Sequence, residues 1–173
     1  AKIIRDKGTN REKFNKNIVK KYTWVDAGSS FAISEINASF LFEQLKKSRF
    51  INKIRMRIWK YYDNYLKKLE YEKKIIRPFV PKYSDHNAHI YYIHIQKKNR
   101  ENLIKNLKNR NISAFFHYVP LHNSPFGLKI SNKTKHLKYT DIKSKTLLRL
   151  PLHTSLNINQ VKHILKNLTK FLS

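Results

Sequence analysis

The chain has 173 residues, about the usual size of one domain, and 40% of them are hydrophobic, which supports a packed core and argues against disorder throughout. Its 37 Lys and Arg residues outnumber 11 Asp and Glu residues, giving a formal net charge of +26. The absence of cysteine excludes a disulfide framework, a thiolate metal site and a cysteine nucleophile.

The charge excess has two interpretations. A nucleic-acid-binding surface concentrates cations where they neutralise phosphates. Here the basic residues are spread from Lys2 to Lys170, and the densest run, 46–74, follows a helical pattern with lysines on its polar face. Abundant Lys, Asn, Ile, Tyr and Phe are also typical of genomes that favour AT-rich codons. We therefore favour a solvated basic surface, and a nucleic-acid-binding module stays the alternative function.

The distribution of apolar residues predicts a soluble chain without a membrane partner. No window approaches the ~18 consecutive apolar residues that a membrane span requires. Residues 1–10 contain no apolar stretch suited to a signal peptide. The cytoplasm is the default location.

The first third of the chain predicts a short helical end, a loop and a long helix. Residues 1–6 are typical of the last turns of a helix closed by Gly8, and residues 11–33 are predicted to form a loop. Ser34 is a good N-cap, and the apolar spacing then continues to Leu69, which predicts one long helix or two in sequence. A single helix would be ~50 Å long and should bridge two bodies or bend.

The rest of the chain alternates strand and helix patterns. Strands are predicted at 75–81, 87–95 and 113–122, the last ending at Pro120, and helices at 100–110, 139–148 and 159–172, with a polar loop over 125–134. The fold class is α+β, with one small, few-stranded antiparallel sheet carrying helices on one face.

The histidines and carboxylates exclude several classes of site. His89 and His94 are five residues apart on one predicted strand, so they point to opposite faces, and no metal site is predicted. The acidic residues are too scattered for a glycosidase pair, no GxSxG motif indicates a nucleophilic serine, and the three glycines form no phosphate-binding loop. His117, Tyr118 and His122 are the better candidates, because they follow a strand into a loop, where sites are commonly built.

Three segments in order resemble the C-terminal half of the DegT/DnrJ/StrS sugar aminotransferases. These are KYTWVDAGSSFAISEINASFLFEQL (21–45), FHYVPLHNSP (116–125) and LLRLPLHTSLN (147–157). The resemblance implies a fold-type-I, pyridoxal-phosphate-dependent enzyme that works as a homodimer. Residues 1–33 would then be the remnant and active-site loop of the large domain, 34–70 a long bridging helix, and 71–173 the small C-terminal domain.

The resemblance also assigns expected roles to single residues. Ser30 occupies the position that helps to hold the cofactor phosphate, where many relatives have Asn. Tyr22 and Trp24 match positions near the nucleotide-sugar substrate, and His117, Tyr118 and His122 match a segment that lines the substrate pocket. Read without the resemblance, Tyr22 and Trp24 are more often core residues and Ser30 a loop residue.

Transamination requires a lysine that forms a Schiff base with pyridoxal phosphate. In this family that lysine precedes everything seen here, ahead of a Gly-rich stretch that this sequence lacks. The expectation is therefore a C-terminal portion that is inactive alone, with no catalytic residue of its own. It would be either one half of a split enzyme with a separate N-terminal half or a non-functional pseudogene remnant.

Overall fold

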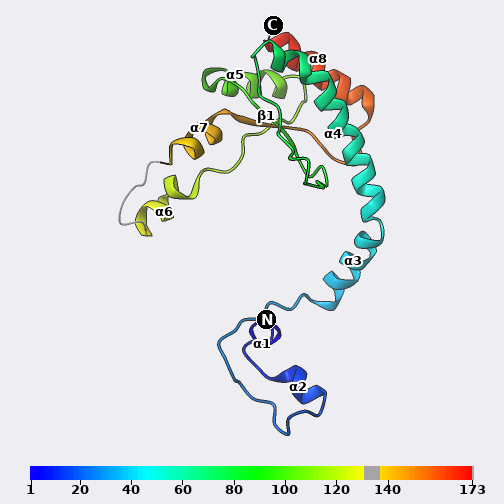
Figure 1. Ribbon diagram of the computed structural model, residues 1–173, viewed down its shortest axis with the longest axis vertical. Coiled ribbons are helices and arrows are strands. Elements are labelled where there is room, and N and C mark those ends of the chain that lie inside the picture. The colour runs from blue at the N-terminus through cyan, green and yellow to red at the C-terminus, as the bar shows by residue number, and fades with distance from the viewer. Residues whose placement is uncertain (131–136, 173) are drawn as a thin grey trace. The chain divides into compact units, whose positions relative to one another are not determined.

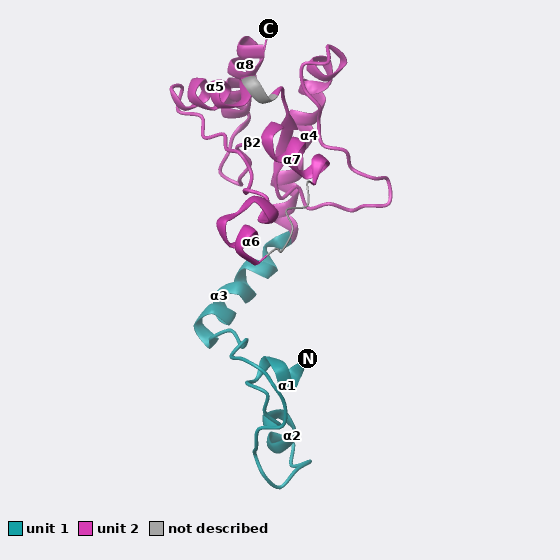
Figure 2. Cartoon of the chain, turned by 90° about the vertical axis from the view of Figure 1, so that its left-hand side faces the viewer, with its two compact units in different colours: residues 1–48 teal, residues 49–173 magenta. Residues whose placement is uncertain are grey.

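The computed structural model describes residues 1–130 and 137–172. They form two compact units, Ala1–Ser48 (unit 1) and Arg49–Ser173 (unit 2), drawn in different colours in Figure 2. Each unit is described separately below. Part of the loop predicted over 125–134 lies outside the described residues.

Unit 1 contains three helices: α1 (Lys2–Arg5), α2 (Arg11–Asn15) and α3 (Glu35–Lys46). α1 is capped as the sequence indicates, since Gly8 has a φ of +76° and its backbone N–H donates to the Ile3 carbonyl at 2.8 Å. α2 was not expected, because residues 11–33 were predicted to be loop throughout. Its five residues make one short helical turn.

The long helical pattern forms two helices in sequence. α3 starts where its N-cap predicts, with the Ser34 hydroxyl accepting a hydrogen bond from the Asn37 N–H at 3.3 Å. Lys47 separates α3 from α4 (Ser48–Tyr71) and has a ψ of 0°, outside the regular helical range. None of the residues of α3 is buried, whereas α4 buries an apolar stripe in unit 2.

Unit 2 adds to α4 the elements β1 (Tyr91–His94), α5 (Lys97–Lys108), η1 (Leu121–Asn123), α6 (Pro125–Ile130), α7 (Lys138–Thr146), β2 (Leu147–Leu150) and α8 (Ile158–Leu172). β1 and β2 pair antiparallel in the register Tyr91↔Leu150 to His94↔Leu147. Figure 1 shows α4, α5 and α8 gathered around this two-stranded sheet. Within the described residues, the α+β class and the small antiparallel sheet predicted from the sequence are confirmed.

The core of unit 2 lies between one face of this sheet and the apolar stripes of three helices. Alternation along β1 and β2 buries every second side chain, as expected for a sheet covered on one face. Apolar residues three or four positions apart complete the core from the helices. The fully buried members include Tyr62, Leu66, Tyr91, Ile93, Leu103, Leu107, Leu148, Val161, Leu165 and Leu168.

Several predicted strands are shorter than expected or only touch the sheet. In the predicted strand 75–81, only Ile76 forms a β-bridge, and its partner is His94. In the predicted strand 113–122, only Phe115 forms a β-bridge, and its partner is Arg149. The prediction of helix over 147–148 was wrong, because Leu147 and Leu148 begin β2.

The helix α6 occupies the start of the segment 125–134, which was predicted to be a loop. Its signal was present, since Ser124 caps the helix by accepting a hydrogen bond from the Gly127 N–H at 3.0 Å and Pro125 is its first residue.

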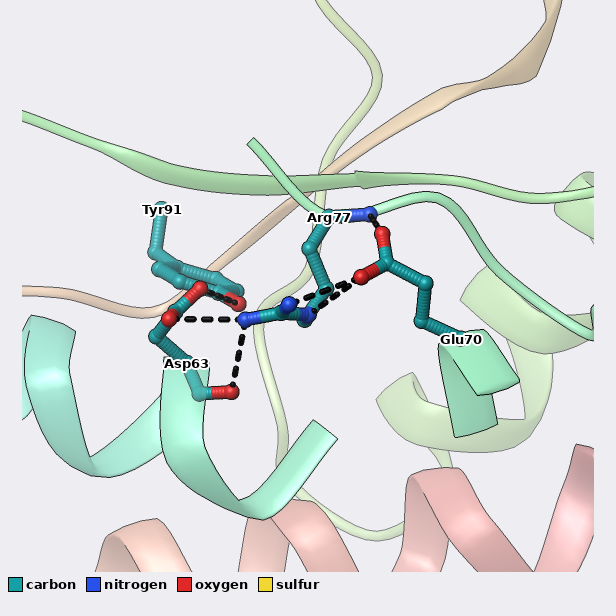
Figure 3. Close-up of polar contacts among 4 residues, drawn as sticks. All are labelled: Asp63, Glu70, Arg77 and Tyr91. Carbon is teal, nitrogen blue, oxygen red and sulfur yellow. Dashed lines mark hydrogen bonds and ion pairs between the residues drawn. The ribbon is translucent and has the colours of Figure 1, made fainter. Parts of the chain in front are cut away.

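A half-buried ionic cluster ties the segment after α4 back onto that helix (Figure 3). The Arg77 guanidinium lies 2.7 Å from a carboxylate oxygen of Asp63 and 2.7 Å from one of Glu70. The Arg77 N–H also donates to Glu70 at 2.8 Å, and the Tyr91 hydroxyl donates to Asp63 at 3.3 Å. Burial and the Asp63 carboxylate raise the pKa of Tyr91, so the phenol stays neutral and acts as a donor.

Candidate substrate-binding site

In unit 1, backbone pairing with the start of the chain holds two of the expected site residues. Thr9 bridges Trp24, and Asp6 bridges Ser30. Trp24 is 74% exposed, and Tyr22, whose ring centroid lies 6.2 Å from that of Phe14, is also exposed. The Ser30 hydroxyl is exposed and has no hydrogen-bond partner among the residues that the structure describes. It is therefore free to donate to an anion.

Gly8 allows this close pairing. A Cβ at position 8 would lie 1.7 Å from the Asp26 carbonyl oxygen and 2.6 Å from the Trp24 indole nitrogen. The Gly8 carbonyl accepts hydrogen bonds from the N–H groups of Val25 and Asp26 at 2.8 and 3.0 Å. A side chain there would push away the backbone that carries Trp24.

Asn10 is a structural residue of this loop that the sequence did not single out. It is 8% exposed, and its amide group donates to the Lys21 carbonyl at 3.0 Å and accepts from the Thr23 N–H at 2.8 Å. The Asn10 N–H donates to the Thr23 carbonyl at 3.1 Å. Asn10 thus fixes the backbone on the N-terminal side of Trp24.

Replacing Asn10 with alanine is expected to free the 21–24 backbone, because two part-buried backbone groups, the Lys21 carbonyl and the Thr23 N–H, lose their partner at a cost of about 1.5 kcal/mol. Hydrogen exchange at the Thr23 amide should become faster by about tenfold or more. Asn15, the exposed last residue of α2, has a side chain that makes no hydrogen bond within the described part of the chain and supplies the control variant Asn15→Ala. Unchanged protection of Thr23 in Asn10→Ala would contradict this role.

In unit 2, His117 and Tyr118 line an open hollow of about 390 Å³ between the start of α5, the segment 116–120 and the end of α7. Their rings lie 4.7 Å apart between centroids. His117 Nδ1 is buried and has no hydrogen-bond partner in the described part of the chain. One imidazole nitrogen of His117 therefore has unused bonding capacity.

Two cations, one carboxylate and an amide add to the polar lining, from Arg100, Lys145, Glu101 and Asn123. The Arg100 guanidinium donates to the Ser144 carbonyl at 2.6 Å, pairs with Glu101 at 2.8 Å and lies 5.8 Å from the centroid of the Phe116 ring. These contacts connect α5, α7 and the segment that carries His117. Such a lining can hydrogen-bond sugar hydroxyls and attract a diphosphate.

His122 has a different environment from His117. Its Nε2 lies 3.0 Å from an Asp141 carboxylate oxygen, and the Asn123 amide donates to the same oxygen at 2.6 Å. Burial raises the pKa of the Asp141 carboxyl, but the hydrogen bonds from Asn123 and His122 outweigh it, so this pKa lies below the ordinary value. His122 and Asn123 thereby attach η1 to α7. His122 is not among the residues that line the hollow.

The six residues expected at the site thus fall into two groups. Tyr22, Trp24 and Ser30 belong to unit 1, and His117, Tyr118 and His122 belong to unit 2. Arg100, Asn123 and Lys145 are candidate site residues that the sequence analysis missed. Asn123 directly follows His122 in the matching segment, whereas Arg100 and Lys145 reach the hollow through the fold.

The fold is that of part of an aminotransferase. NtdA of Bacillus subtilis, solved with bound cofactor PMP, superposes with a TM-score of 0.83 and 18% identity over 98% of this chain and 38% of NtdA. Residues 1–169 match the sequence profile of the DegT/DnrJ/EryC1/StrS aminotransferase family. The chain belongs to this family.

Two curated relatives place the matched region within longer proteins. The uncharacterized protein MJ1066 of Methanocaldococcus jannaschii is 32% identical over 74% of this chain and 34% of its own length. The UDP-4-amino-4,6-dideoxy-N-acetyl-beta-L-altrosamine transaminase of Campylobacter jejuni is 27% identical over 85% of this chain and 40% of its own length. The chain therefore spans less than half the length of these relatives.

Within the described residues, none of the helices has the length and apolar character that a membrane crossing requires.

Proposed function

We propose that this chain is the C-terminal portion of a pyridoxal-phosphate-dependent aminotransferase that acts on a nucleotide sugar. The observation that carries the proposal is the family match over residues 1–169. The proposed reaction transfers an amino group, with glutamate as the donor, to the keto group of a dTDP-4-keto-6-deoxyhexose. The product would serve the synthesis of surface polysaccharide or enterobacterial common antigen.

The choice of this keto-sugar rests on a finer resemblance. RDKGTNR (5–11), YTW (22–24), GSS (28–30) and FHYVPLH (116–122) resemble segments of dTDP-4-amino-4,6-dideoxygalactose transaminases. The relative in Campylobacter jejuni is named for a UDP-linked sugar, so both uridine and thymidine nucleotides are ligands to test.

The residues present fit the roles proposed for them. The exposed Ser30 hydroxyl can donate one hydrogen bond to a phosphate oxygen of pyridoxal phosphate, and the bridge to Asp6 fixes its backbone. The cofactor would supply the electron sink for amino transfer. In the hollow, His117 and Tyr118 would bond the sugar, while Arg100 and Lys145 would attract the diphosphate. Tyr22 and Trp24 offer exposed aromatic faces for a sugar ring or a base.

The proposal includes two protein partners. The resemblance implies that the Schiff-base lysine of the family lies before the region that this chain covers, and we propose that an N-terminal half supplies it. A homodimer is the proposed assembly, as the family resemblance implies. A nucleic-acid-binding module is not favoured, because family membership accounts for the sequence motifs and the basic residues are dispersed along the chain. A non-functional remnant is the outcome if neither test below succeeds.

The first test measures binding of dTDP-glucose and UDP-glucose to the chain by calorimetry. His117→Ala and Tyr118→Ala are each expected to weaken binding by about tenfold, since each removes a hydrogen bond or a ring contact to the ligand. Tyr83→Ala is the matched control, because Tyr83 is 92% exposed and does not line the hollow. Equal affinity in all variants would contradict the proposal that the nucleotide sugar binds in the hollow at His117 and Tyr118.

The second test concerns the complete reaction. The chain is co-expressed with a polypeptide that carries the lysine-bearing half of a family member, and the purified pair is examined for the visible absorbance of bound pyridoxal phosphate. Absorbance together with glutamate-dependent amination of the keto-sugar supports the proposal. A colourless, inactive pair would contradict it.

A further inference from the structure

Arg149 occupies a fixed position in β2. It pairs with Tyr92 of β1 on one side, and on the other its N–H donates to the Phe115 carbonyl at 2.7 Å and its carbonyl accepts from the Phe115 N–H at 3.1 Å. The backbone is therefore held from both edges. The side chain lies on the half-buried face of the strand, away from Leu148 and Leu150 in the core.

The Arg149 guanidinium has no counter-ion within the described part of the chain. Its Nε is buried without a hydrogen-bond partner. The other half-buried arginines of the described part all have an acceptor. Arg77 and Arg100 each pair with a carboxylate at 2.8 Å or less, Arg55 donates to the His89 carbonyl at 2.6 Å, and Arg110 donates to the Asn106 side chain at 2.7 Å. A half-buried guanidinium without such a pair lacks the hydrogen bonds and the charge compensation that normally stabilise it.

A hollow of about 310 Å³ lies against Arg149. The side chains of His89, Ser113 and His153 also line it and can donate hydrogen bonds. Apolar side chains such as Phe115 and Leu152 form the rest of its walls. None of the residues that line it is acidic. Apolar walls lower the local dielectric constant, which strengthens the attraction between the guanidinium and an anion.

We infer that this hollow, which we call the Arg149 hollow, is a binding site for an oxyanion, either a carboxylate or a phosphate group. The planar guanidinium matches two oxygens of such a group in a bidentate arrangement. The ligand would supply the acceptor that the Arg149 side chain lacks, and the hydroxyl and imidazoles around it would bond its remaining oxygens.

The Arg149 hollow shares no lining residue with the hollow at His117. The same extended segment of the chain lines both hollows. Ser113 and Phe115 line the Arg149 hollow, and Phe116 to Pro120 line the hollow at His117. Both reactants of the proposed function are anions, since glutamate carries carboxylates and the nucleotide sugar carries a diphosphate. The assignment of the anion to one of them rests on the proposed function, whereas oxyanion binding itself does not.

The test titrates the full chain with inorganic phosphate and, separately, with L-glutamate at constant ionic strength. NMR signals of the His89 and His153 imidazoles report occupancy. A saturable shift with at least one probe is expected, and Arg149→Gln should weaken it by about tenfold or more. Saturation by glutamate alone identifies a carboxylate ligand, and saturation by phosphate alone a phosphoryl ligand.

Arg57→Gln is the matched control, because it removes the same charge from an exposed position on α4. Its titration should equal that of the unmodified chain. Arg149→Lys keeps the charge without the planar fork and is expected to restore part of the affinity. The inference fails if neither probe saturates the histidine shifts, or if Arg149→Gln binds as tightly as Arg57→Gln. These measurements require no transamination, so their outcome is independent of the co-expression test.

Discussion

Leu148→Ala is expected to lower the free energy of unfolding of unit 2 by about 3 kcal/mol, the usual cost of a cavity left by a buried leucine. Leu148 is fully buried and lies opposite Ile93 in the two-stranded sheet. A sheet this small has little neighbouring structure that can collapse into the space. Urea unfolding followed by circular dichroism measures the change.

Leu121→Ala is the control for this experiment, because the Leu121 side chain is 84% exposed and its removal should cost little. Leu148→Ile keeps the volume and should cost less than half as much as alanine. If Leu148→Ala and Leu121→Ala unfold at the same urea concentration, the core described for unit 2 is wrong.

Arg77→Met is expected to destabilise unit 2 by about 2 kcal/mol, because it leaves Asp63 and Glu70 without their cation. Breaking a fully buried pair costs about 3–5 kcal/mol, and partial solvent exposure of this cluster reduces that value. The side chains of Arg77, Asp63 and Glu70 are 19%, 20% and 34% exposed. Arg49→Met removes a cation from an exposed position of α4 and should change stability by less than about 0.5 kcal/mol.

The same cluster predicts a dependence of stability on pH. Burial raises the pKa of Glu70, but hydrogen bonds from the Arg77 backbone and guanidinium outweigh it, so this pKa lies below its ordinary value of 4.5. A carboxyl with a lowered pKa in the folded state stabilises the fold above its unfolded pKa, and this stabilisation is lost as the pH falls. The stability difference between the unmodified chain and Arg77→Met should therefore be fully present above the ordinary pKa of 4.5 and narrow as the pH falls below it. A constant difference would contradict the ionic origin of the effect.

Local signals predicted the longer helices well, whereas the short helices α2 and α6 were missed. The Ser34 cap, the closure of α1 by Gly8 and the apolar spacing of α4 and α8 each depend on neighbouring residues in the sequence, and the structure contains all of them. The strands were harder to predict, because their extent depends on distant partners. Leu147 and Leu148 continue the helical pattern of α7, and pairing with β1 turns them into strand.

At the candidate site, too, residues adjacent in the sequence could be predicted, and residues brought together by the fold could not. His117 and Tyr118 could be predicted because they belong to one contiguous segment. Arg100 and Lys145 could not be predicted, because they lie far from that segment in the sequence. Arg100 precedes His117 by 17 residues and Lys145 follows it by 28, and only the fold brings them to the same hollow. Arg149 carries no local signal of binding either. Its unpaired state becomes visible only when the surrounding side chains are in place.

The two tryptophans of the chain lie in different units, and their environments differ. Trp24 is 74% exposed in unit 1, whereas Trp59 is 9% exposed in unit 2, with its ring centroid 4.6 Å from that of His86 and 5.3 Å from that of Tyr91. Water around an indole shifts its fluorescence to longer wavelengths. The emission spectrum therefore contains a separate optical reporter for each unit, with the shorter wavelengths following the core of unit 2 and the longer ones the loop of unit 1.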